Sequence, residues 1–200
     1  MIFRALAVIP LLALAACGAS AQAESGPWHN DIVATTFWVG EVIGSGPNDS
    51  QRVSAYVENW YASYGGCDGV VKDGSCETEP RTAANDYFPT QMTPKQNPFY
   101  LDLPVSDPAL KDRWVQIQGP NGNTCYGQIE DAGPTLYDDR DYVFGTARPA
   151  NTRFNGTGMD VSPALNGCLG FAELNGSEDR VNWRFVDSPP PGPWTRIVTR

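Results

Sequence analysis

The sequence predicts a mainly β fold, a small loop-rich barrel with one or two short helices. The 200 residues include 20 glycines and 17 prolines, a composition that disfavours long helices. Several short segments combine β-branched and aromatic residues, as strands do. Only one segment carries the signals of a helix start. The length is sufficient for one domain with a sizeable core.

Strand-like composition or alternation marks six segments: residues 36–43, 52–57, 113–118, 124–130, 141–144 and 181–185. The third and fourth flank a Gly-Pro-Asn-Gly turn, and Val115 and Ile117 share one face of the third, so we expect a hairpin. The last segment (VNWRF) alternates apolar and polar residues and is expected to close the barrel.

The helix start lies at Ser162 and Pro163, a capping residue followed by proline at the first helical position. Gly167 and Gly170 keep this helix short. Residues 188–200 form a Pro-rich tail that begins SPPPGPW. We expect an extended conformation there, with Trp194 as a residue that could dock on the domain.

The N-terminus is typical of an export signal. Arg4 precedes an apolar stretch over residues 5–16, which is too short to span a membrane permanently. The stretch ends in Leu-Ala-Ala-Cys17, which resembles a bacterial lipobox and would make Cys17 the lipid-carrying N-terminus. The alternative is ordinary cleavage after Ala23, in an A-x-A pattern. We therefore assign residues 1–17 to the signal, 18–34 to a flexible tether, 35–187 to the barrel and 188–200 to the tail.

Five cysteines are an odd number for an exported chain, and lipidation of Cys17 would leave four. Four cysteines allow three pairings, which sequence does not strictly distinguish. We expect Cys67–Cys76, because it closes a compact loop, and Cys125–Cys168, because it would link two barrel segments. Zinc binding is the alternative, but the chain has no C-x-x-C and an oxidising compartment favours disulfides.

The net charge is −9, with a sequence pI of about 4.5. This excludes binding to nucleic acid or to an anionic membrane surface through bulk charge, so we expect membrane contact through the lipid anchor only. The single histidine, His29, lies in the N-terminal extension, which disfavours a Ser-His-Asp triad or a histidine metal site. No cofactor or metal is expected. The acidic loop at residues 137–142 (YDDRDY) could hold calcium but lacks the D-x-D-x-D-G spacing, so a solvated loop is favoured.

Four pieces of the chain resemble, in order, the motifs of the double-psi β-barrel of rare lipoprotein A, a module also found in expansins and barwin-like endoglucanases. RTAANDY, from Arg81, resembles that family's R-T-A-S-G-E-x motif. Met92-Thr93, with LDLP at residues 101–104, resembles its M-T-A segment and the following L-P. The hairpin that ends in EDAGP resembles its V-x-V-x-N-x-x-N-G hairpin and D-R-G-P. The segment GMDVSPA, from Gly158, resembles its I-I-D-L-S-x-A and the H-F-D-L-S of expansins.

This resemblance covers roughly residues 52–187 and implies a six-stranded double-psi barrel, stapled by the disulfides. The chain departs from the family in three ways. Asp86 stands where family enzymes carry glutamate, and no histidine follows it. The insert at residues 137–155, between the two aspartate motifs, is longer than usual.

The resemblance implies three candidate catalytic residues: Asp131, Asp160 and Asp86. A carboxyl partly removed from water can have its pKa raised and deliver a proton to a glycosidic oxygen, and a second carboxylate nearby separates an acid from a base. Each has a plainer alternative. Asp131 could accept turn N–H groups, Asp160 could cap the helix or strand end, and Asp86 could serve a turn.

Aromatic side chains that could contact a sugar are Trp60, Tyr61 and Tyr64, clustered in VENWYASYGG, and Tyr137 beside the acidic loop. Their alternative role is core or rim packing.

We therefore expect an exported bacterial lipoprotein, anchored at the cell envelope on its periplasmic or extracellular face. It would bind cell-wall glycan, such as peptidoglycan, and cleave it as a lytic transglycosylase or glycoside hydrolase, with Asp131 as general acid/base. A lytic reaction needs only one good acid/base group, because a hydroxyl of the sugar attacks. The alternative is a non-catalytic barrel that binds polysaccharide, as expansins do, or binds a protein.

Overall fold

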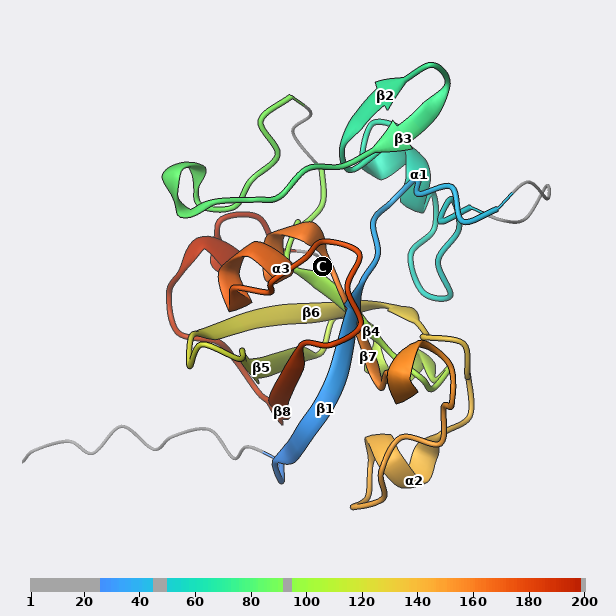
Figure 1. Ribbon diagram of the computed structural model, residues 1–200, viewed down its shortest axis with the longest axis vertical. Helices are drawn as coiled ribbons and strands as arrows, with labels where there is room; N and C mark the ends of the chain where they lie inside the picture. Colours follow the sequence, from blue (N-terminus) through green and yellow to red (C-terminus); the bar gives the residue numbers. More distant parts are fainter. Residues whose placement is uncertain (1–25, 45–49, 92–94, 199–200) are drawn as a thin grey trace, which may run out of the picture.

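The computed structural model describes residues 26–44, 50–91 and 95–198. Its centre is a closed barrel of six strands (Figure 1): β1 (His29–Thr36), β4 (Tyr100–Leu103), β5 (Trp114–Gln118), β6 (Thr124–Ala132), β7 (Met159–Val161) and β8 (Arg180–Val186). Around the barrel the strands follow the order β1-β7-β4-β6-β5-β8. The β1–β7 and β4–β6 pairs are parallel, and the other pairs are antiparallel. The predicted mainly β barrel is confirmed.

Apolar side chains at alternate positions of the strands fill the barrel interior. In β5, Val115 and Ile117 are buried while their neighbours are half-exposed, and β8 buries Val181, Trp183 and Phe185 in the same way. These side chains belong to one hydrophobic cluster that spans all six strands. The predicted hairpin is confirmed, since β5 and β6 pair from Trp114 to Gln118, and β8 closes the barrel between β1 and β5.

The predicted helix is α3 (Pro163–Leu169), which Figure 1 shows beside β6. The Ser162 side chain accepts a hydrogen bond from the Leu165 N–H at 3.2 Å, and Gly170 ends the helix in a left-handed conformation. Gly127 lets the helix approach β6 closely. A Cβ at that position would lie 2.7 Å from Leu165 Cδ1.

Replacing Ser162 with alanine is expected to lower the free energy of unfolding by about 1 kcal/mol, because it removes the side-chain acceptor of the α3 cap. Urea unfolding measures the change. Ser188→Ala in the exposed tail is the matched control and should change nothing. Equal effects of the two substitutions would contradict a capping role.

Residues 37–44 and 50–91 form a cap that carries α1 (Trp60–Ser63) and the β2 (Val70–Lys72) and β3 (Ser75–Glu77) hairpin, beyond one end of the barrel (Figure 1). The cap has its own aromatic core, which packs on Tyr100 of β4. The Tyr100 hydroxyl accepts a hydrogen bond from the Val39 N–H and donates one to Asp68 Oδ2 at 2.8 Å. These bonds fix the cap to the barrel.

A buried ion pair holds the start of the RTA motif inside the cap. Arg81 Nη2 donates to Asp68 Oδ1 at 3.1 Å and to the Asp68 carbonyl at 2.9 Å. Both side chains are almost completely buried. Burial raises the pKa of Asp68 to about 6, and the charge of Arg81 opposes this rise. Arg81 therefore has a structural partner within the cap.

Both expected disulfides are present, Cys67–Cys76 within the cap and Cys125–Cys168 between β6 and α3. The zinc alternative for these cysteines is therefore wrong. Cys17 and the rest of the signal segment lie outside the described residues.

Three strand predictions were wrong. The strand expected at residues 36–43 is only the end of β1, because Phe37 and Val39 turn into the aromatic core of the cap. Residues 52–57 bend instead of extending, since Ser54 Oγ accepts the N–H groups of Tyr56 and Val57. Residues 141–144 fall mostly in the helical turn α2 (Arg140–Val143), which buries two adjacent side chains.

The boundaries of the domain also differ from the expectation. β1 begins at His29, so residues 29–34 belong to the barrel and not to a tether, and His29 stacks on Trp183 at 4.0 Å between ring centroids. The tail docks through Trp194, which is 9% exposed and packs against Tyr126. Four 3₁₀ turns complete the fold: Ala83–Asn85, Pro108–Leu110, Phe154–Gly156 and Pro193–Thr195. Within the described ranges, the helices are all too short or too polar to cross a membrane.

Candidate functional site

Three aspartates from neighbouring strands lie in one row across the barrel wall. Asp102 of β4 is opposite Asp160 of β7 on one side and opposite Asp131 of β6 on the other. Beyond Asp160, the row continues to Thr35 of β1. Residues in register share a face, and the two strand neighbours of Asp102 belong to the hydrophobic core. The row therefore faces away from the barrel interior, toward the cap.

A β-bulge brings Asp131 into this row. Leu101 pairs with Ile129, whereas the next residue, Asp102, pairs with Asp131, so Glu130 is the extra residue of β6. Bulges of this kind re-aim side chains and recur next to functional sites.

Asp131 is 7% exposed, and its contacts hold the cap against β6. Its Oδ1 accepts hydrogen bonds from the Ala55 N–H at 2.7 Å and the Ala132 N–H at 2.8 Å. Burial raises the pKa of Asp131 to about 6, while these bonds and one from Ser54 lower it. The Ser54 hydroxyl also donates to the Glu130 carbonyl. Asp131 thus combines a raised pKa with a clear anchoring role.

Asp102 is the most buried member of the row, at 3% exposure. Its Oδ1 accepts the Asp160 N–H at 3.1 Å. Burial raises its pKa well above the usual range, and the charges of Asp160 and Asp131 raise it further. The backbone of Gly133 passes so close that a Cβ there would lie 2.6 Å from Asp102 Oδ2. Burial and the two neighbouring carboxylates therefore favour the neutral form of Asp102.

Asp160 and Glu41 are the two members of the cluster that reach solvent, since both are only partly buried. The Thr35 hydroxyl donates to Asp160 Oδ1. Burial raises the pKa of Asp160 to about 6, with a smaller contribution from Asp131. Burial also raises the pKa of Glu41 to about 7, and the charge of Asp160 adds to the rise. Both carboxyls therefore have raised pKa values, and the charge of Asp160 acts on Glu41.

Gly40 positions Glu41. It has a φ of +85°, and a Cβ there would lie 2.8 Å from the Gly66 carbonyl oxygen. The close contact with the cap and the left-handed turn both require glycine at this position. The turn leads into Glu41, whose carboxyl is affected by the charge of Asp160.

These pKa shifts predict a protein that is most stable under mildly acidic conditions. A carboxyl whose pKa is higher in the folded state stabilises the fold below its unfolded pKa, and this contribution is lost as pH rises through the folded value. The folded values are about 6 for Asp131 and Asp160 and about 7 for Glu41. The lowered pKa of His29 opposes the trend, because protonation of His29 then favours unfolding.

Thermal unfolding followed from about pH 4.5 to pH 7.5 should therefore show a falling midpoint. Asp160→Asn should flatten the curve, because it removes one titrating group and lowers the pKa of Glu41. A midpoint that rises with pH over this range would contradict the assigned shifts.

The third predicted catalytic residue lies elsewhere. Asp86 has a φ of +56° at the end of a 3₁₀ turn, its side chain is 64% exposed, and it faces Arg196 at 3.5 Å. Its charge is not among the causes that shift the pKa of the three aspartates of the row or of Glu41. In the ranges that the structure describes, no group of three or more His, Cys, Asp or Glu side chains has the arrangement of a metal site.

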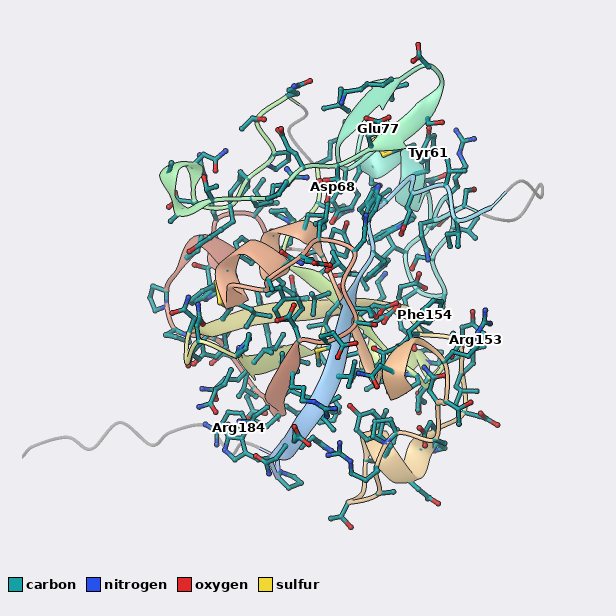
Figure 2. All side chains as sticks on the ribbon, viewed as in Figure 1. Tyr61, Asp68, Glu77, Arg153, Phe154 and Arg184 are labelled. Carbon is teal, nitrogen blue, oxygen red and sulfur yellow. A yellow bond between two sulfur atoms is a disulfide. The ribbon has the colours of Figure 1, made fainter. Side chains whose placement is uncertain are left out.

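The four aromatic candidates divide into two pairs. Trp60 and Tyr64 are each 1% exposed and form the aromatic core of the cap, where the Tyr64 hydroxyl donates to the Asn97 carbonyl at 2.6 Å. Their rings therefore pack instead of offering a face to a sugar. Tyr61, a residue of α1, is half-buried in the cap (Figure 2), and Tyr137 is 60% exposed.

Two shallow hollows lie on the surface. One, of about 480 Å³, is lined by residues 52–54 and 57–62 of the cap. The other, of about 500 Å³, is lined by α2 and the residues that follow it. Neither is lined by an aspartate of the row. The first is next to it, because Ser54 lines the hollow and contacts Asp131.

Sequence reasoning missed two of the four carboxylates, Asp102 and Glu41. Asp102 had a weak signal, an acid between two leucines in LDLP, where alternation places it on the face opposite the core. Glu41 had none, because its proximity to Asp160 depends on how the cap folds back over the barrel.

Comparison with known proteins adds no family assignment: no protein-family model matches the chain, and no curated protein matches it either.

Proposed function

We propose that this chain is an exported cell-envelope protein whose barrel is a double-psi barrel that binds cell-wall glycan and cleaves it by acid/base catalysis. The observation that carries the proposal is the carboxylate cluster. Its two solvent-reaching members, Asp160 and Glu41, have pKa values of about 6 and about 7. Such values suit a group that must give and take a proton near neutral pH.

The proposed chemistry needs one proton cycle. Glu41, protonated in a large fraction of molecules, donates its proton to the glycosidic oxygen as the C–O bond breaks. A sugar hydroxyl attacks the anomeric carbon in a lytic reaction, or water does so in hydrolysis, and its proton returns to a carboxylate of the cluster. Burial raises the pKa of Glu41, and the negative charge of Asp160 raises it further. Asp131, the acid implied by the family resemblance, is better suited to position the cap, because its Oδ1 already accepts two backbone N–H groups.

Export and anchoring are supported by the N-terminal sequence and the disulfides. The apolar stretch that ends at Cys17 is typical of a lipoprotein signal, and disulfides persist in oxidising compartments. We propose an anchor at the bacterial envelope through lipid on Cys17, with release after Ala23 as the alternative.

A second candidate function is binding that loosens polysaccharide without cutting, as in expansins. A specific observation favours it: Asp131 is almost completely buried, and its Oδ1 already accepts two backbone N–H groups.

Incubation of the protein from Gly18 onward with purified peptidoglycan, followed by mass spectrometry, distinguishes the candidates. Anhydro-ended fragments would support a lytic transglycosylase, and new reducing ends would support a hydrolase. Co-sedimentation without products would support the binding function. A result with no products and no binding would contradict both candidate functions.

A further inference from the structure

The hollow of the cap has polar walls and an aromatic floor. It is lined by Arg52, Ser54, Glu58, Asn59, Trp60 and Tyr61, together with three smaller apolar residues. Figure 2 shows Tyr61, a residue of α1, in the cap. The hollow is lined by one cation, Arg52, and one acidic side chain, Glu58.

Arg52 lies over the ring of an aromatic neighbour. Its guanidinium carbon lies 4.0 Å from the centroid of the Tyr61 ring. Stacking of this kind orients the plane of the guanidinium and leaves the N–H groups along its edge available. Across the described part of the chain, Arg52 forms no ion pair with an acidic side chain.

The other hollow provides an internal comparison. Arg140 also lies over an aromatic ring, that of Phe144 at 4.8 Å, and also lines a hollow. Its Nη1, however, donates to Asp107 at 2.9 Å, so its charge is already satisfied. Both arginines lie over an aromatic ring and line a hollow, but of the two only Arg52 has a guanidinium edge available for an anion.

A second observation concerns Trp60. Its indole Nε1 is buried and has no hydrogen-bond acceptor among the described residues. The indole N–H groups of Trp183 and Trp194 each have an acceptor at 2.8 Å, and that of Trp38 has one at 3.5 Å. Buried donors are rarely left without an acceptor, and Trp60 is one of the residues that line this hollow.

We propose that this hollow binds a carboxylate-bearing sugar unit of the glycan, with the fork of the Arg52 guanidinium on the carboxylate and Tyr61 holding that guanidinium in place. A planar, pre-oriented guanidinium binds a carboxylate through two parallel hydrogen bonds. Ser54 joins the hollow to the aspartate row, so a bound chain would extend toward Asp160. The glycan as substrate class rests on the proposed function, whereas the anion site rests on Arg52 alone.

Isothermal titration tests this site with two probes of equal length. One is an oligomer of alternating N-acetylglucosamine and N-acetylmuramic acid without stem peptides, and the other is a neutral chitin oligomer. The native protein should bind the first about tenfold more tightly or better, the increment expected for a charge-assisted hydrogen bond. Arg52→Gln should lose this preference and keep its affinity for chitin, while Arg52→Lys should recover only part of it.

Arg140→Gln is the matched control and should retain the full preference. Equal affinity of the native protein for the two oligomers, or an unchanged preference in Arg52→Gln, would overturn the assignment, and so would an equal loss in Arg140→Gln. The binding preference for the carboxylate-bearing oligomer is measured independently of cleavage. A carboxylate preference in a protein that releases no fragments would sustain this site and reject the catalytic proposal, whereas cleavage without a preference would do the reverse.

Discussion

Asp160→Asn is expected to reduce glycan cleavage by about 10²–10⁴-fold, the usual contribution of a general acid/base pair. The substitution removes the charge of Asp160, which after burial is the second cause of the raised pKa of Glu41, so a smaller fraction of Glu41 holds a proton near neutral pH. The fold should survive, because the asparagine oxygen can still accept the Thr35 hydroxyl. Release of soluble fragments from peptidoglycan measures the rate. The remaining activity should peak at a lower pH than that of the native protein.

Asp86→Asn is the control for this prediction. Asp86 was the third catalytic candidate from the sequence, and the structure places it on the surface beside Arg196. Its substitution should leave the rate within a factor of about two, since exposed changes away from a site have small effects. Comparable losses from both substitutions would contradict the assignment of catalysis to the row.

Arg81→Met is expected to lower the free energy of unfolding by about 3–5 kcal/mol, because it leaves the buried carboxylate of Asp68 without its cation. The loss should be larger at pH 8 than at pH 5. Asp68 has a pKa of about 6, which rises further without Arg81, so at pH 5 it accepts a proton and the penalty shrinks. Denaturant unfolding at the two pH values measures both effects.

Arg180→Met gives the matched comparison. Arg180 pairs with Asp31 at 3.4 Å, but both side chains are about half exposed or more. Exposed pairs of this kind contribute about 0–1 kcal/mol. Similar losses for Arg81→Met and Arg180→Met would mean that the Asp68–Arg81 pair does not hold the cap together.

Local signals explain which parts of the fold could be predicted. The β5–β6 hairpin has a turn between alternating strands, and α3 has Ser162 as a cap that acts in the structure as expected. β4 and β7 offered no such signal. All four residues of β4 are buried, which removes the alternation, and β7 has only three residues. The position of β1 was predicted wrongly because the aromatic run after it, which packs in the cap, has the composition of a strand.

The candidate site was predictable only in part, for a related reason. Asp131 and Asp160 stood out through their motifs, and the structure brings both into one row. The cluster itself arises from register, from the bulge at Glu130 and from the fold of the cap, all of which are long-range features. Trp60 illustrates the converse, since an aromatic that suggests a sugar platform in the sequence serves as core in the structure.

The most direct test of the account is a carboxyl NMR titration of Glu41 in the native protein and in Asp160→Asn. The account predicts a midpoint of about 7 in the native protein, against an ordinary value of 4.5, and a clear decrease when the charge of Asp160 is removed. A midpoint near 4.5 in both proteins, or a raised midpoint that does not respond to the substitution, would contradict the proposal that Glu41 and Asp160 act as one proton-exchanging pair.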